Sequence, residues 1–174
     1  MAQVVFETPR LIARRLEPED RQAMLAVYGD VEAMRYVGDG TPLSPEECDR
    51  WLVVTAENYE KRGYGMFALV ERETGAVVGF CGLVHFGGQA DPEIKYALLR
   101  TMWGRGLATE AARALLGYGA AAHGLKMIIA TVAPDNHASQ SVLAKAGMER
   151  GALRHDEDGD TQLFHWRPPE SAAP

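Results

Sequence analysis

The chain has 174 residues, of which 47% are hydrophobic and 24% are charged, a balance typical of one globular domain with a sizeable core. Its formal net charge of −6 argues against a nucleic-acid-binding surface, because such surfaces need an excess of Lys and Arg. No apolar run approaches the roughly 20 residues of a membrane span, and the opening MAQVVFETPR lacks the pattern of a signal peptide. Cys48 and Cys81 match no metal or redox spacing, so we expect a cytoplasmic protein with free thiols and no metal.

Hydrophobic periodicity predicts strands and helices that alternate along the chain. The clearest helix has a capping-box pattern, Ser44 with Glu47, at its start and Gly63 at its end. In chain order we predict a strand at 10–16, helices at 17–30 and 44–63, a hairpin of 66–71 and 76–86, a strand at 93–99, a helix ending near 123–124, a strand at 126–132, a helix at 137–147, and a closing hairpin within 148–167.

This order predicts a mostly antiparallel sheet that is followed by one strand–helix–strand–helix unit. The fold class is therefore α+β, or mixed α/β, with a single domain over residues 1–174. Residues 168–174, with the sequence PPESAAP, are predicted to be a frayed tail.

The stretch LLRTMWGRGLATEAARALLGYG, residues 98–119, passes from a strand directly into an alanine-rich helix. Gly104 and Gly106 flank Arg105 at this turn, where backbone N–H groups and the positive end of the helix dipole favour phosphate. The P-loop pattern is absent, and Thr109 stands where a dinucleotide pattern needs its third glycine. The motif alone leaves two interpretations open, a phosphate cradle or a helix start that only needs flexible residues.

The wider sequence resembles the GNAT superfamily of acyl-CoA N-acyltransferases. The segments that carry the resemblance are EIKYALLRTMWGRGLATEAARALLGYG and NHASQSVLAKAGM, and the branch that they resemble is that of RimJ- and RimL-type ribosomal-protein N-terminal acetyltransferases. The resemblance implies a V-shaped splay between the fourth and fifth predicted strands, 93–99 and 126–132, with acetyl-CoA as co-substrate in it. The family's usual Arg or Gln before the glycine loop is Thr101 here, with Arg100 one residue earlier.

The resemblance also implies which residues bind the co-substrate. The pyrophosphate would lie over the loop from Gly104 to Thr109, and the pantetheine would pair with backbone at 98–100. The implied acetyl-CoA-binding residues are Leu98, Leu99, Arg100, Met102, Gly104, Arg105, Gly106, Leu107, Ala108, Thr109, Asn136 and Ser139.

Direct transfer to an amine requires a proton acceptor, because an alkylamine with a pKa near 10.4 is mostly protonated at neutral pH. Glu93 is the first candidate for this base, with a solvated strand-end carboxylate as the alternative, and His85 is a weaker candidate. Many members of the superfamily use a tyrosine to assist the thiolate, but that position is Leu143 here. The branch's N-x-x-S pattern instead implies that Ser139 contacts the sulfur and Asn136 the pantetheine, although Asn136 also fits a helix cap. Ser141 is a less favourably spaced candidate.

The expected function is therefore acetyl transfer from acetyl-CoA to a primary amine in a ternary complex. The expected partners are acetyl-CoA and the amine, either a protein N-terminus or a small molecule, and a second copy of the chain is a further candidate partner. Because the usual tyrosine is missing, a non-catalytic module that senses acyl-CoA or amines stays open as the alternative.

Overall fold

The structure, a computed structural model, describes residues 2–170. Its strands are β1 (Val4–Glu7), β2 (Leu11–Arg15), β3 (Met66–Glu71), β4 (Val77–Val84), β5 (Glu93–Leu98), β6 (Ile128–Val132), β7 (Glu149–Asp156) and β8 (Gly159–Trp166). Its helices are α1 (Arg21–Tyr28), α2 (Val31–Met34), α3 (Pro45–Arg62), α4 (Leu107–His123) and α5 (His137–Ala146), with short 3-10 turns at Pro18–Asp20, Phe86–Gly88 and Arg100–Met102.

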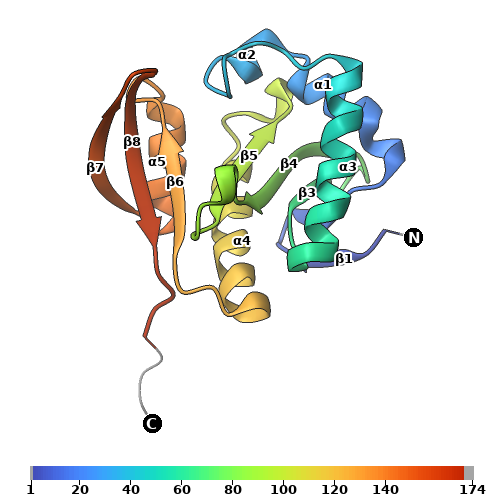
Figure 1. The fold of residues 1–174 in the computed structure, drawn as a ribbon. Helices are drawn as coiled ribbons and strands as arrows, with labels where there is room; N and C mark the ends of the chain where they lie inside the picture. Colours follow the sequence, from blue (N-terminus) through green and yellow to red (C-terminus); the bar gives the residue numbers. More distant parts are fainter. Residues whose placement is uncertain (1, 171–174) are drawn as a thin grey trace.

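One sheet of eight strands runs through the molecule in the order β1-β2-β3-β4-β5-β6-β8-β7. Every neighbouring pair is antiparallel except β5 and β6, which are parallel and pair at one register position, Glu93 with Ile129. Beyond that position the two strands diverge, and Figure 1 shows β1 to β5 on one side and β6, β8 and β7 on the other. We call this divergence the splay.

Helices cover both faces of the sheet. On one face α4 and α5 bury Leu107, Leu115 and Leu143 against the strands, in the larger of two hydrophobic clusters. On the other face α1 and α3 bury Met24 and Cys48 against strand residues in the second cluster. Each such apolar side chain contributes about 1.5–3 kcal/mol when it is fully buried, so the two layers hold the edges of the splay in place.

The helix ends agree with the predicted capping chemistry. Glu47 donates its backbone N–H to Ser44 Oγ at 3.2 Å, and Ser44 N–H donates to Glu47 Oε2 at 2.7 Å, which confirms the capping box of α3. Gly63, Gly124 and Gly147 follow α3, α4 and α5 with positive φ, a conformation that lets a helix end without a Cβ clash.

Two elements were not predicted, β1 and α2. β1 pairs with β2 through a register shift and has exposed residues at both ends, so it has no alternating pattern. α2 has only four residues and depends on the Asp30 side chain, which accepts the Glu32 N–H at 3.0 Å. The predicted fourth and fifth strands correspond to β5 and β6 because β1 adds one strand at the edge.

Several smaller expectations concern the ends and the thiols. Cys48 and Cys81 are both buried and free, as predicted. No helix within residues 2–170 has the length and apolarity that a membrane crossing requires. Residues 171–174 of the predicted frayed tail lie outside the described residues.

Candidate active site

The backbone conformation at the start of α4 explains why two glycines flank Arg105. Gly104 has φ +74° and Gly106 has φ +76°, a left-handed backbone that strains any residue with a Cβ. Gly106 is the N-cap of α4, and within the described part of the chain no side chain caps this helix. The first N–H groups of a helix have no partner inside it, so those of Leu107, Ala108 and Thr109 are available to a ligand at the positive end of the helix dipole.

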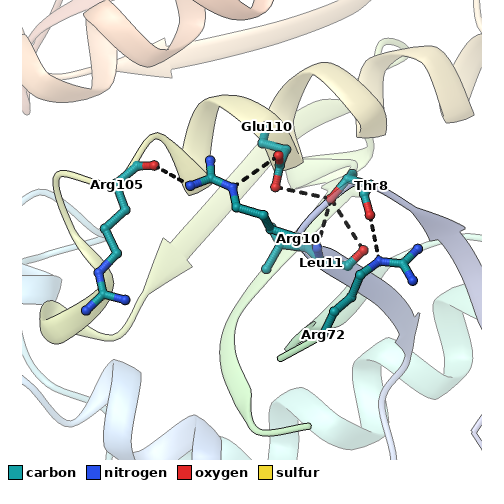
Figure 2. A network of polar contacts seen from close by, with 6 residues as sticks. All are labelled: Thr8, Arg10, Leu11, Arg72, Arg105 and Glu110. Atoms are coloured by element: carbon teal, nitrogen blue, oxygen red, sulfur yellow. Dashed lines mark hydrogen bonds and ion pairs between the residues drawn. The ribbon is translucent and has the colours of Figure 1, made fainter. Parts of the chain in front are cut away.

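Arg10, in the corner between β1 and β2, contacts both this loop and the first turn of α4, as Figure 2 shows. Arg10 Nη1 donates to the Arg105 carbonyl at 2.8 Å, and Arg10 Nε lies 3.3 Å from Glu110 Oε1 in the first turn of α4. Thr8 Oγ1 donates to the other oxygen of Glu110 at 3.2 Å. The Arg105 guanidinium points away from this network and is exposed.

Within residues 2–170, the edge of β5 that faces the splay pairs with β6 at one register position only. Leu99 N–H donates to Val78 on the β4 side at 2.9 Å, so strand alternation turns the N–H of Leu98 toward the open edge. The Leu98 carbonyl accepts the Trp103 indole N–H at 3.0 Å, which fixes the strand to the glycine loop. Leu98 therefore offers a backbone donor to a ligand in the splay, whereas the N–H of Leu99 is already used.

Two predicted acetyl-CoA contacts are engaged elsewhere. The Met102 side chain is buried in the core, and its N–H donates to the Leu99 carbonyl at 2.9 Å. The Arg100 guanidinium pairs with Asp30 at the start of α2, with 3.0 Å between Nε and Oδ2, and this hydrogen bond lowers the pKa of Asp30. Arg100 thus ties α2 to the end of β5 through its side chain, whereas the predicted contact with the pantetheine involves its backbone.

Glu93 lies at the single point where β5 and β6 pair, and it is only 3% exposed. Its Oε1 accepts the Thr131 N–H at 3.1 Å, the Thr131 hydroxyl and Lys95 Nζ at 2.8 Å. Its Oε2 has one distant donor, Gln89 Nε2 at 3.5 Å. The alternative of a solvated strand-end carboxylate is therefore wrong, because β6 covers the side chain, and Oε2 is the oxygen with capacity left for an amine or a water.

His85 is held by two hydrogen bonds. Its Nδ1 lies 2.9 Å from the Gln89 carbonyl, which only accepts, so Nδ1 carries a proton. Its Nε2 lies 2.8 Å from the Tyr64 hydroxyl. Both nitrogens are occupied, and this leaves no free lone pair for an acceptor amine.

Ser139 is in the first turn of α5, on the opposite side of the splay from β5. Its Oγ lies 2.6 Å from the Tyr96 hydroxyl, and its backbone N–H donates to Asn136 Oδ1 at 3.1 Å. Asn136 thus has the capping role. Leu143 is buried in the core and cannot donate a hydrogen bond.

The sequence-predicted residues form two groups around the splay. Tyr96 alternates with Glu93 and Lys95 along β5, so the tyrosine faces α4 and α5, and the carboxylate and ammonium face the side of α1 and α3. Ser139 joins the Tyr96 group. Sequence reasoning missed three contacts, those of Tyr96 with Ser139, Lys95 with Glu93, and Arg10 with Arg105, because each depends on a partner distant in sequence or on side-chain direction.

Within residues 2–170, no three His, Cys, Asp or Glu side chains come together in a way that could hold a metal ion. The acidic tip at residues 155–160 is the turn of the β7–β8 hairpin, and His155 Nδ1 lies 2.6 Å from Asp160 Oδ1 in it.

A family model described as an acetyltransferase (GNAT) domain matches residues 10–149. The chain belongs to the GNAT acetyltransferase family. A Bacillus subtilis protein named uncharacterized N-acetyltransferase YoaA is 34% identical over 154 residues, which cover 86% of each chain. This GNAT chain is accordingly an acetyltransferase, as its motifs predicted.

Solved structures share the GNAT fold over nearly the whole chain. A GNAT-family acetyltransferase from Bacillus anthracis has a TM-score of 0.79 at 24% identity and covers 96% of this chain and 98% of its own. RimL, a ribosomal L7/L12 alpha-N-protein acetyltransferase solved with coenzyme A, has a TM-score of 0.79 at 14% identity, with 95% and 98% coverage. At these identities the similarity confirms the predicted fold and leaves the RimJ/RimL branch a prediction.

Proposed function

We propose that this acetyltransferase binds acetyl-CoA in the splay and transfers the acetyl group directly to a primary amine in a ternary complex. The single observation that supports this most strongly is the meeting of an uncapped start of α4 with the open edge of β5. The first can hold a pyrophosphate, and the second can pair with a pantetheine arm. RimL, which has the same fold, was solved with coenzyme A.

In the proposed complex the pyrophosphate contacts the backbone from Gly104 to Thr109. The thioester lies along β5, where the Leu98 N–H donates to the carbonyl oxygen as negative charge develops on it. Ser139 donates to the sulfur, and Asn136 flanks the pantetheine.

Glu93 is the proposed proton acceptor, either directly or through a water on Oε2. The three donors on Oε1 keep the carboxylate in place and leave Oε2 facing the acceptor. The amine nitrogen then attacks the thioester carbon, the C–S bond breaks, and the electron pair leaves with sulfur as the CoA thiolate. The proton from nitrogen passes to Glu93 or its water. The acceptor is a protein N-terminus, as in the RimJ/RimL branch, or a small-molecule amine.

The test is acceptor-dependent release of free CoA, followed with a thiol reagent against N-terminal peptides, polyamines, amino acids and aminoglycosides. Release of free CoA that occurs in the presence of one class of amine and does not occur in its absence supports the proposal. Binding of acetyl-CoA without release for any amine would support the sensor alternative, and absence of binding would reject both.

A matched pair of variants tests the phosphate cradle. Gly106→Val and Gly75→Val introduce the same side chain at φ +76° and φ +72°, so they carry similar backbone strain. Only the first lies at the start of α4, and the second is in the β3–β4 turn. We expect acetyl-CoA affinity, measured by calorimetry, to fall at least tenfold for Gly106→Val and to stay at the parent value for Gly75→Val. Equal affinities would contradict the cradle.

A further inference from the structure

Two hydroxyl groups meet across the splay. Tyr96 comes from β5, and Ser139 comes from the first turn of α5, and their hydroxyl oxygens are 2.6 Å apart. The Tyr96 hydroxyl also lies 3.3 Å from the Ser139 backbone carbonyl. Tyr96 is thus the residue of β5 that touches the serine proposed to contact the sulfur.

We propose that Tyr96 is a positioning residue for the leaving group, whose hydroxyl donates to Ser139 Oγ so that the serine proton points at the CoA sulfur. This inference rests on the proposed function, because it assumes that the thioester lies beside Ser139. Neither the tyrosine nor its position is part of the N-x-x-S pattern by which Ser139 was identified.

The proton count of the pair supports a switch between two arrangements. Tyr96 and Ser139 have one hydroxyl proton each. In the arrangement without a ligand that satisfies both protons, serine donates to the tyrosine oxygen across the 2.6 Å contact, and tyrosine donates to the Ser139 carbonyl. When a thiolate forms beside Ser139, tyrosine turns its proton to Ser139 Oγ, and the serine proton becomes free for sulfur.

The reversed arrangement stabilises charge that exists only after the C–S bond begins to break. A hydrogen bond to an ionised acceptor is roughly twice as strong as a neutral one. The pair therefore favours the transition state over bound acetyl-CoA, which is the condition for raising the rate and not merely the affinity.

Tyr96 does not supply the proton itself. Burial raises the pKa of Tyr96 to about 12, whereas a free thiol has a pKa near 8.5. Transfer from tyrosine to thiolate is then unfavourable by a factor of roughly 3,000. CoA leaves as a hydrogen-bonded thiolate, and tyrosine keeps its proton while it orients serine.

The decisive experiment measures the pKa of the CoA thiol in its complex with the protein, from the ultraviolet absorbance of the thiolate against pH. Tyr96→Phe retains the ring and removes the hydroxyl. We expect it to raise the pKa of the bound thiol by about 0.5 to 1, as one hydrogen bond to the charged form weakens. Tyr118→Phe is the control, because this variant loses a tyrosine hydroxyl that is 2.8 Å from His123 and does not contact Ser139. We expect it to leave the pKa of the bound thiol unchanged.

A double-mutant cycle with Ser139→Ala separates positioning from packing. If tyrosine acts through serine, the Tyr96→Phe/Ser139→Ala protein has the same thiol pKa and the same turnover as Ser139→Ala alone. Turnover of Tyr96→Phe should fall about three- to tenfold with little change in the KM for acetyl-CoA.

The outcomes distinguish the two proposals. CoA that does not bind the parent protein rejects the proposed function and the inference with it. CoA that binds with an unchanged thiol pKa in Tyr96→Phe overturns the inference alone. Additive effects in the cycle would also overturn it, since they would mean that Tyr96 acts without Ser139.

Discussion

Replacing Arg10 with Gln tests whether the β1–β2 corner sets the shape of the glycine loop. Arg10 Nη1 donates to the Arg105 carbonyl at 2.8 Å. In a trans peptide the C=O and the following N–H point in opposite directions. Holding the Arg105 carbonyl therefore aims the Gly106 N–H away from Arg10. Without the hydrogen bond from Arg10, the loop has to be ordered when the pyrophosphate binds, and that ordering reduces the affinity.

The magnitude follows from the chemistry and exposure of the contact. A hydrogen bond from a charged donor contributes about 1.5–3 kcal/mol, and the Arg10 side chain is 49% exposed, so solvent screening reduces the value to about 1–2 kcal/mol. That range corresponds to a loss of about five- to thirtyfold in acetyl-CoA affinity. Calorimetry of acetyl-CoA binding to Arg10→Gln measures it.

Arg72→Gln is the matched control for this prediction. Arg72 Nε donates to the Thr8 carbonyl at 2.7 Å in the same corner, and Figure 2 shows it on the far side of Thr8 from the glycine loop. We expect this variant to lose some thermal stability while it binds acetyl-CoA like the parent. Parent-like acetyl-CoA affinity in Arg10→Gln, or an equal loss of affinity in both variants, would refute the argument that Arg10 orients the peptide between Arg105 and Gly106.

Two further predictions concern the carboxylate and the sheet. Glu93→Gln should slow transfer on the order of 10²-fold with little change in acetyl-CoA affinity, and its residual rate should rise with pH as the free amine becomes abundant; a parent-like pH–rate profile would place the base elsewhere. Gly82→Ala should cost roughly 1–3 kcal/mol of unfolding free energy, because a Cβ there would lie 2.6 Å from Met66 Cα, and each kcal/mol should lower the thermal midpoint by about 2–4 °C. The control is Gly117→Ala on α4, where a Cβ would meet no atom within 4 Å, and it should be neutral or stabilising in the same melt.

Local chemistry explains why most of the fold could be predicted. The ends of α3, α4 and α5 are determined by residues within a few positions, such as Ser44 with Glu47 and the glycines that follow each helix. β1 and α2 lack such signals. α2 is stabilised by Asp30, whose carboxylate caps the helix and also binds Arg100, a residue 70 positions away.

The bonding within the candidate site could not be predicted from the sequence. Glu93 was expected at a strand end, yet its burial depends on Thr131, which only the pairing of β5 with β6 brings within reach. The Tyr96 hydroxyl contacts Ser139, which lies 43 residues later in the chain. Contacts of this range follow from topology, and no local pattern in the sequence encodes them.

The alternation of β5 explains how one strand can serve both halves of the proposed reaction. Glu93 points toward the α1 and α3 side, and Tyr96 points toward α4 and α5, where Ser139 and the glycine loop lie. At the end of the same strand, the open edge offers the Leu98 N–H to the thioester carbonyl. If β6 continued to pair with β5, its backbone hydrogen bonds would occupy this edge. The proposed transfer therefore requires the two strands to pair at one position and then diverge. Because Glu93 occupies that position and bonds Thr131, the residue proposed to take the proton is also the one that fixes where the splay begins.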